Sequence, residues 1–177
     1  MDTRRVAVAF VLVVALVSVG VLAGGLNPLL TTDGYQPVGT ETATPLEYEQ
    51  TTVTVVDADS GDQLGGVQAA VADTWRKRYT GLSKTDSLPE NRGMLFTYDA
   101  EGSHTYVMRG MSFGIDIVYV AANGTITRIH HAPEPPEDAD GEEFEYPGTG
   151  QYVLEVNYDW TTRHNVTEGD RVEIGDT

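Results

Sequence analysis

The sequence predicts an α+β domain in which β-structure dominates: a compact, mostly antiparallel, partly closed β-barrel with two short helices, preceded by one N-terminal hydrophobic helix. Three observations predict it. Short β-branched and aromatic runs recur through residues 49–177, turn residues separate them, and two stretches carry helix signals. The 177-residue chain has no cysteine, so its core must be stable without disulfides.

The N-terminal residues predict a membrane segment. Residues 6–23 are almost entirely apolar and follow Arg4 and Arg5. As a helix they would be about 27 Å long, close to the ~30 Å hydrocarbon core of a bilayer. We expect residues 1–5 to be a cytoplasmic n-region and residues 6–23 to be either a transmembrane anchor or a signal peptide cleaved after Ala23. The remainder would then lie outside the cytoplasm, as a flexible linker at 24–48 and an exported β-rich domain at 49–177.

The first elements of that domain follow from local patterns. Val53 and Val55 alternate with polar residues, which predicts a strand at 51–57. A second strand is expected at 67–72. Asp73 and Thr74 offer an N-cap for a short helix at 75–79, which Gly81 would end.

The later elements are mainly strands. Asn123-Gly124 is the strongest hairpin signal, and it joins two apolar segments. A second short helix is expected at 160–165, and the acidic, proline-containing stretch 132–150 is expected to be a loop. The remaining predicted strands cover residues 94–98, 104–108, 115–122, 125–130, 152–156 and 172–174.

Charge limits the possible partners. The chain carries 27 acidic and 11 basic residues, for a formal net charge of −16, and Lys77 and Lys84 are its only lysines. Nucleic acid is excluded as an expected partner because phosphate binding needs clustered Lys and Arg. A surface for multivalent cations or a basic partner would also be acidic. The low lysine count and the even spread of acids favour adaptation to very high salt, as in an extreme halophile.

A set of ordered motifs resembles one known family. The set is Asp73-Thr74, Arg78, Gly81-Leu82, Gly93-Met94-Leu95-Phe96, Met108, Ile115-Asp116-Ile117, Gly124, Ile126, Tyr152-Val153-Leu154-Glu155-Val156 and Gly169-Asp170. It is similar to the prokaryotic domain-of-unknown-function family 192 over about residues 51–175. The resemblance implies a small β-rich domain, often exported or membrane-anchored, with no established activity. Where the family has Phe-Trp-Met-Lys-Asn-Thr, this chain has Tyr106-Val107-Met108-Arg109-Gly110-Met111, so an aromatic or amide contact there is lost.

Asp116 is the main candidate site residue. It lies between Ile115 and Ile117 in the most apolar strand, and a buried carboxylate requires a partner. We expect that partner to be an arginine from a neighbouring segment, Arg78, Arg92 or Arg109, because a bidentate pair would satisfy the carboxylate. Such a pair could orient a pocket or simply fix the register of the barrel.

Glu155 raises the same question on another strand. Asp116 and Glu155 could in principle flank a glycosidic bond, as in a hydrolase. No cofactor is expected, and no metal site, because His130 and His131 are adjacent in a strand and face opposite ways. The predicted ligand-binding residues are Arg78, Met108, Arg109, Asp116 and Glu155.

Three functional classes remain open at this point. The preferred one is a membrane-tethered extracytoplasmic binding or accessory domain for a polar small molecule, such as a saccharide, or for a cell-surface partner. The second is the glycosidase-like hydrolase, and the third is a purely structural envelope component. Asn123 and Asn165 begin glycosylation tripeptides, which fit an exported protein.

Overall fold

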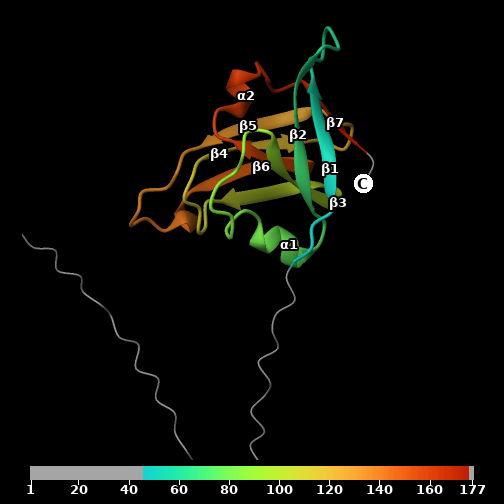
Figure 1. Cartoon of the computed structure of the whole chain (residues 1–177). Coiled ribbons are helices and arrows are strands. Elements are labelled where there is room, and N and C mark those ends of the chain that lie inside the picture. Colours follow the sequence, from blue (N-terminus) through green and yellow to red (C-terminus); the bar gives the residue numbers. More distant parts are fainter. Residues whose placement is uncertain (1–45, 176–177) are drawn as a thin grey trace, which may run out of the picture. The chain divides into compact units, whose positions relative to one another are not determined.

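A computed structural model describes residues 46–175 (Figure 1). The predicted segments 1–5 and 6–23 and nearly all of the predicted linker lie outside the described residues. Among the described residues 46–175, no helix has the length and apolar character needed to cross a bilayer. The elements are β1 (Gln50–Val56), β2 (Gln63–Ala72), α1 (Trp75–Thr80), β3 (Arg92–Val107), β4 (Ile115–Val120), β5 (Ile126–Ala132), η1 (Gly141–Glu143), β6 (Glu145–Asn157), α2 (Trp160–Arg163) and β7 (Arg171–Ile174).

The strands form one curled sheet in the order β5-β4-β6-β3-β2-β1-β7. All named pairings are antiparallel except β2 with β3, which α1 connects. The two edges meet at one end, where Thr125 bridges to Arg171 and the Ile126 amide donates to Asp170 O at 2.8 Å. This near-closure confirms the predicted fold class, a mostly antiparallel and partly closed barrel with two short helices.

The sheet has a hydrophobic core on each face, because successive strand side chains point in opposite directions. Val118, Leu154 and Val156 face the inside of the curl and pack with Trp160 of α2. Ile117 and Val153 face the outside, where the segment after α1 covers them with apolar side chains. Figure 1 shows α1 and α2 on opposite sides of the sheet.

Both predicted helices form, and the caps of α1 explain its limits. Thr74 is the N-cap of α1, with its side-chain oxygen accepting from the Lys77 amide at 3.3 Å. Gly81 ends the helix with φ +47°, a conformation that glycine adopts at no steric cost. The predicted cap and stop of this helix are therefore confirmed.

Two strands are longer than the sequence indicates. β3 is one continuous strand that includes most of the two separately predicted strands, 94–98 and 104–108. Its pairing with β6 has a register irregularity between Thr97 and Gly102. β6 begins at Glu145, within the stretch that was expected to be a loop. Gly141 makes this possible: a Cβ there would lie 2.2 Å from Met108 O, so only glycine lets this stretch approach β3.

Candidate functional site

Asp116 is fully buried on β4 and holds the start of α2. One carboxylate oxygen accepts from His131 Nδ1 at 2.8 Å and from the Asp159 amide at 3.1 Å. The other accepts from the Thr161 amide at 2.9 Å and from the Thr161 hydroxyl at 2.6 Å. The prediction of an arginine partner is wrong, because Asp116 points to the side of the sheet that α2 covers.

His131 was missed as the strand partner of Asp116. The two residues lie directly opposite each other in the β4–β5 hairpin. Counting outward from a two-residue turn at Asn123-Gly124 also places Asp116 opposite His131. In the structure the connection has three residues, because the Ala121 amide donates to Thr125 O. A bulge between Tyr119 and Val120 restores the counted register. Our prediction considered only whether His130 and His131 could chelate one ion together.

The donor atoms of Asp116, His131 and Asp159 lie within 4.8 Å of one another, so these three residues could surround a cation. Both oxygens of Asp116 already accept hydrogen bonds, which satisfies its charge without an ion. Chemically, the arrangement orients the half-exposed His131 ring through Nδ1. The best-supported role of the hydrogen bonds around Asp116 is structural, because they hold α2 against the sheet.

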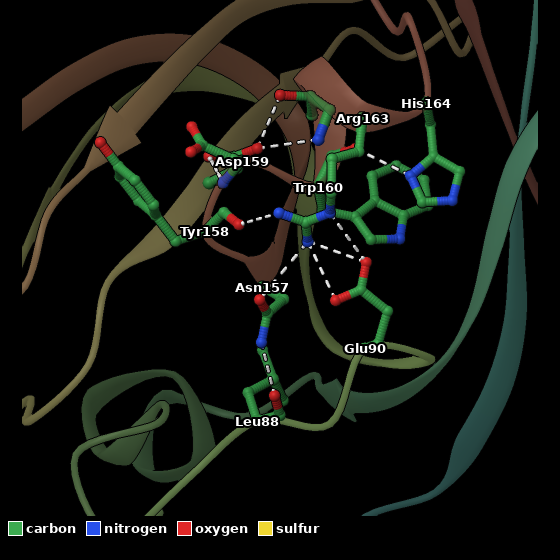
Figure 2. Close-up of polar contacts among 10 residues, drawn as sticks. Leu88, Glu90, Asn157, Tyr158, Asp159, Trp160, Arg163 and His164 are labelled. Atoms are coloured by element: carbon green, nitrogen blue, oxygen red, sulfur yellow. Dashed lines mark hydrogen bonds and ion pairs between the residues drawn. The ribbon is translucent and has the colours of Figure 1, made fainter.

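Figure 2 shows a second set of contacts around α2. Arg163 donates to both carboxylate oxygens of Glu90, at 2.8 and 2.9 Å, and to Tyr158 O at 2.7 Å. Asn157 Nδ2 donates to Leu88 O at 2.6 Å. These contacts join α2 to the loop after α1 across the end of the sheet.

Glu155 lies on the opposite face from Asp116. In the β4–β6 pairing, Asp116 is opposite Val156 and Ile117 is opposite Glu155, so the two carboxyl groups leave different sides of the sheet. The arrangement in which they flank one glycosidic bond is therefore not formed. Burial alone raises the pKa of Glu155 to about 8, with no hydrogen bond or neighbouring charge contributing.

A cavity of about 210 Å³ lies beside Glu155, between the α1 region, β3 and β6. Its lining includes Arg78 and Arg109, two of the predicted site residues, together with aromatic side chains. Met108 is fully buried in the outer core and does not line this cavity. The structure thus brings together Arg78, Arg109 and Glu155, and it separates Met108 and Asp116 from them.

Backbone carbonyls hold Arg78 in place. Its Nη1 donates to Asp73 O at 2.7 Å and to Thr97 O at 2.8 Å, and its guanidinium lies over the Tyr98 ring at 4.9 Å. None of the ion pairs within residues 46–175 includes Arg78. Its positive charge is therefore fixed at the cavity without a directly paired carboxylate among these residues, although the Asp73 carboxylate lies near enough for the two charges to interact.

Arg109 closes another part of the cavity wall. It donates to Tyr79 O at 2.6 Å and to Glu142 Oε1 at 3.1 Å, and it lies 4.1 Å above the Tyr79 ring. The ion pair between Arg109 and Glu142 is partly exposed, so solvent weakens the attraction between the two charges.

Sequence reasoning missed the tyrosines of the cavity. The hydroxyls of Tyr98 and Tyr106 lie 3.0 Å apart, and burial strongly raises the pKa of Tyr106. Both line the cavity with Glu155. Tyr106 stands in the motif that departs from the family pattern, but the sequence does not show that Tyr98 and Glu155 lie beside it.

Comparison with known proteins agrees on the fold. Residues 55–174 match the model of DUF192, described as "Uncharacterized ACR". No curated protein matches the chain. The crystal structure of a candidate transcription regulator from Sinorhizobium meliloti 1021 is similar, with a TM-score of 0.65, 24% identity and coverage of 73% of this chain and 97% of that one.

A protein of unknown function from Novosphingobium aromaticivorans DSM 12444 is also similar, with a TM-score of 0.62, 24% identity and coverage of 78% of this chain and 89% of that one. At this identity the two structures show a shared fold and nothing about activity. The family match covers most of the chain. The chain therefore belongs to the DUF192 family.

Proposed function

We propose that this chain is a membrane-tethered, extracytoplasmic binding or accessory domain whose cavity beside Glu155 holds a polar small molecule, with saccharides as the leading class. One observation carries the proposal: a buried carboxyl group, with a pKa raised by burial alone, lines the same cavity as two arginines. Buried polar groups normally have partners, and a ligand would supply the missing one.

The cavity chemistry supports a ligand with several polar atoms. Near neutral pH the Glu155 carboxyl is largely protonated, so it offers one O–H donor and an acceptor. Arg78 offers guanidinium donors that no carboxylate occupies, and Tyr98 and Tyr106 add hydroxyls and ring faces. Hydroxyl-rich molecules that also carry apolar ring faces, such as sugars, match this combination.

The proposed membrane tether is supported by the sequence alone. Residues 6–23 are apolar and long enough to span a bilayer, and two arginines precede them. This part of the proposal is independent of the cavity and is tested separately, by mass spectrometry of the native N-terminus. A mature chain that begins at Gly24 would contradict the tether and leave the cavity proposal standing.

A thermal-shift screen of the full chain in detergent, at high salt, tests the ligand. The panel would contain neutral sugars, acidic sugars and nucleotides. A ligand at a hundredfold excess over its dissociation constant adds about 2.7 kcal/mol to the free energy of unfolding. A flat response across the panel contradicts the proposal.

Variants locate the binding site. Arg78→Gln should remove the response, because its charge faces the cavity. Glu155→Gln should retain the response near neutral pH, because it preserves a neutral group of the same shape. Arg171→Gln is the control, since Arg171 is exposed and pairs with Val56 on β1, outside the cavity lining. Each variant is first melted without ligand to show that it folds.

A further inference from the structure

The helix α1 exposes two large aromatic side chains. Trp75 and Tyr79 are 72% and 57% exposed, the highest values among the large hydrophobic residues of the described chain. Their rings stack, with centroids 5.5 Å apart and planes 20° apart, and the Arg109 guanidinium lies 4.1 Å from the centroid of the Tyr79 ring. Both side chains are therefore held in place while they remain in contact with water, at an energetic cost that a partner surface would remove.

The same helix concentrates positive charge in an acidic protein. Arg76, Lys77 and Arg78 are consecutive, although acidic residues outnumber basic ones 27 to 11 in the chain. Lys77 is mostly covered and pairs with Asp73 at 2.8 Å, and Arg78 lines the cavity. Arg76 is therefore the basic residue that α1 presents to solvent. Arg76 is exposed and belongs to none of the ion pairs formed among residues 46–175. A partner that suits this surface must therefore combine negative charge with an apolar layer.

The position of α1 in the domain identifies such a partner. Lys77 Nζ lies 5.6 Å from the centroid of the Tyr48 ring, and Leu46 and Tyr48 line a cavity together with Thr80 and Gly81. The first described residues thus lie against the α1 region. The chain that precedes them includes the apolar run 6–23, which we propose to lie in a membrane.

We propose that α1 is a membrane-contact surface, in which Trp75 and Tyr79 enter the headgroup region and Arg76 meets anionic lipid headgroups. Amphipathic aromatic rings prefer this interfacial zone, and basic residues beside it are attracted to anionic lipids. The proposal rests on the tether of the proposed function and is independent of the ligand cavity. It assigns a role to the two most exposed large hydrophobic side chains among residues 46–175.

Tryptophan fluorescence of the full chain in lipid nanodiscs tests this contact. The chain has two tryptophans, and Trp160 is only 1% exposed, so a quencher in the bilayer reports on Trp75. The discs would contain phosphatidylcholine brominated near the headgroup, alone or in equal parts with phosphatidylglycerol. We expect quenching in the anionic discs and its loss in Trp75→Phe.

Variants that remove one basic side chain distinguish contact with lipid headgroups from mere closeness to the bilayer. Arg76→Gln should weaken the contact about fivefold, which is the usual effect of one basic residue near an anionic surface. Arg171→Gln, which removes an exposed charge at the Val56 end of β1, should leave the quenching unchanged. Thermal melts of each variant exclude unfolding as the cause of a change.

Four outcomes would overturn the inference. One is an unquenched Trp75 in a chain that has entered the discs, which leaves the tether intact. The second is equal quenching in neutral and anionic discs, because headgroup charge would then play no part. The third is a shift of Trp75 emission by polygalacturonate but not by anionic discs, which would assign the surface to an acidic polysaccharide. A chain that does not enter the discs contradicts the tether and this inference together.

Discussion

Asp116 and Glu155 lie one pairing step apart on adjacent strands, yet their side chains point to opposite faces of the sheet. Asp116 accepts four hydrogen bonds at the start of α2, whereas the pKa of Glu155 is raised by burial alone. The two carboxyl groups therefore have different roles. Asp116 stabilises the fold through its hydrogen bonds to α2 and β5, and Glu155 is available to the cavity as a neutral acid.

The free energy of unfolding should decrease as the pH rises, because of Glu155. Its pKa in the folded state, about 8, is above its ordinary value of 4.5, so between these values the folded chain holds a proton that the unfolded chain has lost. The free energy of unfolding should fall by up to about 1.4 kcal/mol per pH unit in this window and be unaffected by Glu155 above it. Urea unfolding across the window, compared with Glu155→Gln, measures this. Parallel profiles for the two proteins would contradict the prediction.

The hydroxyl of Thr161 should contribute measurably to stability. Thr161→Val removes its 2.6 Å hydrogen bond to a fully buried carboxylate and keeps the shape of the side chain. The expected loss is about 1.5–3 kcal/mol, typical for a hydrogen bond to a charged group. Chemical denaturation checks this, with Thr162→Val as the control, because Thr162 is exposed on the same helix. Equal losses in both variants would show that helix propensity, rather than Asp116, determines the effect.

The ion pair between Glu90 and Arg163 should contribute much less. It is bidentate, but the two side chains are 58% and 43% exposed (Figure 2). Exposed pairs typically contribute less than about 1 kcal/mol. Glu90→Gln should therefore change the unfolding midpoint only slightly, and less than Thr161→Val does. The reverse order would mean that the loop after α1 depends on this pair.

Gly141→Ala should disturb the approach of η1 to β3. The new Cβ would lie 2.2 Å from the backbone oxygen of Met108, which cannot rotate away. We expect a loss of about 1–3 kcal/mol, the usual cost of overpacking. Gly102→Ala is the control, because its Cβ would meet only the His104 ring, at 3.7 Å. A thermal melt of both variants gives the comparison, and an unchanged Gly141→Ala protein would contradict this account of β6.

Local chemistry made much of the fold predictable. The Thr74 cap, the Gly81 stop and the hairpin at Asn123-Gly124 depend on backbone preferences of a few residues, and all are present in the structure. The continuation of β6 into the proline-containing stretch depends on pairing with β3, which lies far away in sequence. Pro147 weakens the strand signal locally, and distant partners outweigh it.

The site was less predictable than the fold. The apolar setting of Asp116 correctly indicated burial, but its partners come from the N-terminal end of α2 and from β5. Only counting residue pairs outward from Asn123-Gly124 could have identified His131 as the strand partner of Asp116. The cavity joins the α1 region, β3 and β6, so its tyrosines could not be grouped before the sheet order was known.

The sheet order also determines when the chain can fold. β1 pairs with β7, and β6 joins β3 to the β4–β5 hairpin, so residues near position 53 need partners near position 174. Non-local pairings of this kind form slowly. A chain that emerges N-terminus first cannot complete its sheet until Ile174 is available to pair with Val53. If the domain is exported as we propose, this delay would keep the polypeptide unfolded, which is the state that a translocation channel requires.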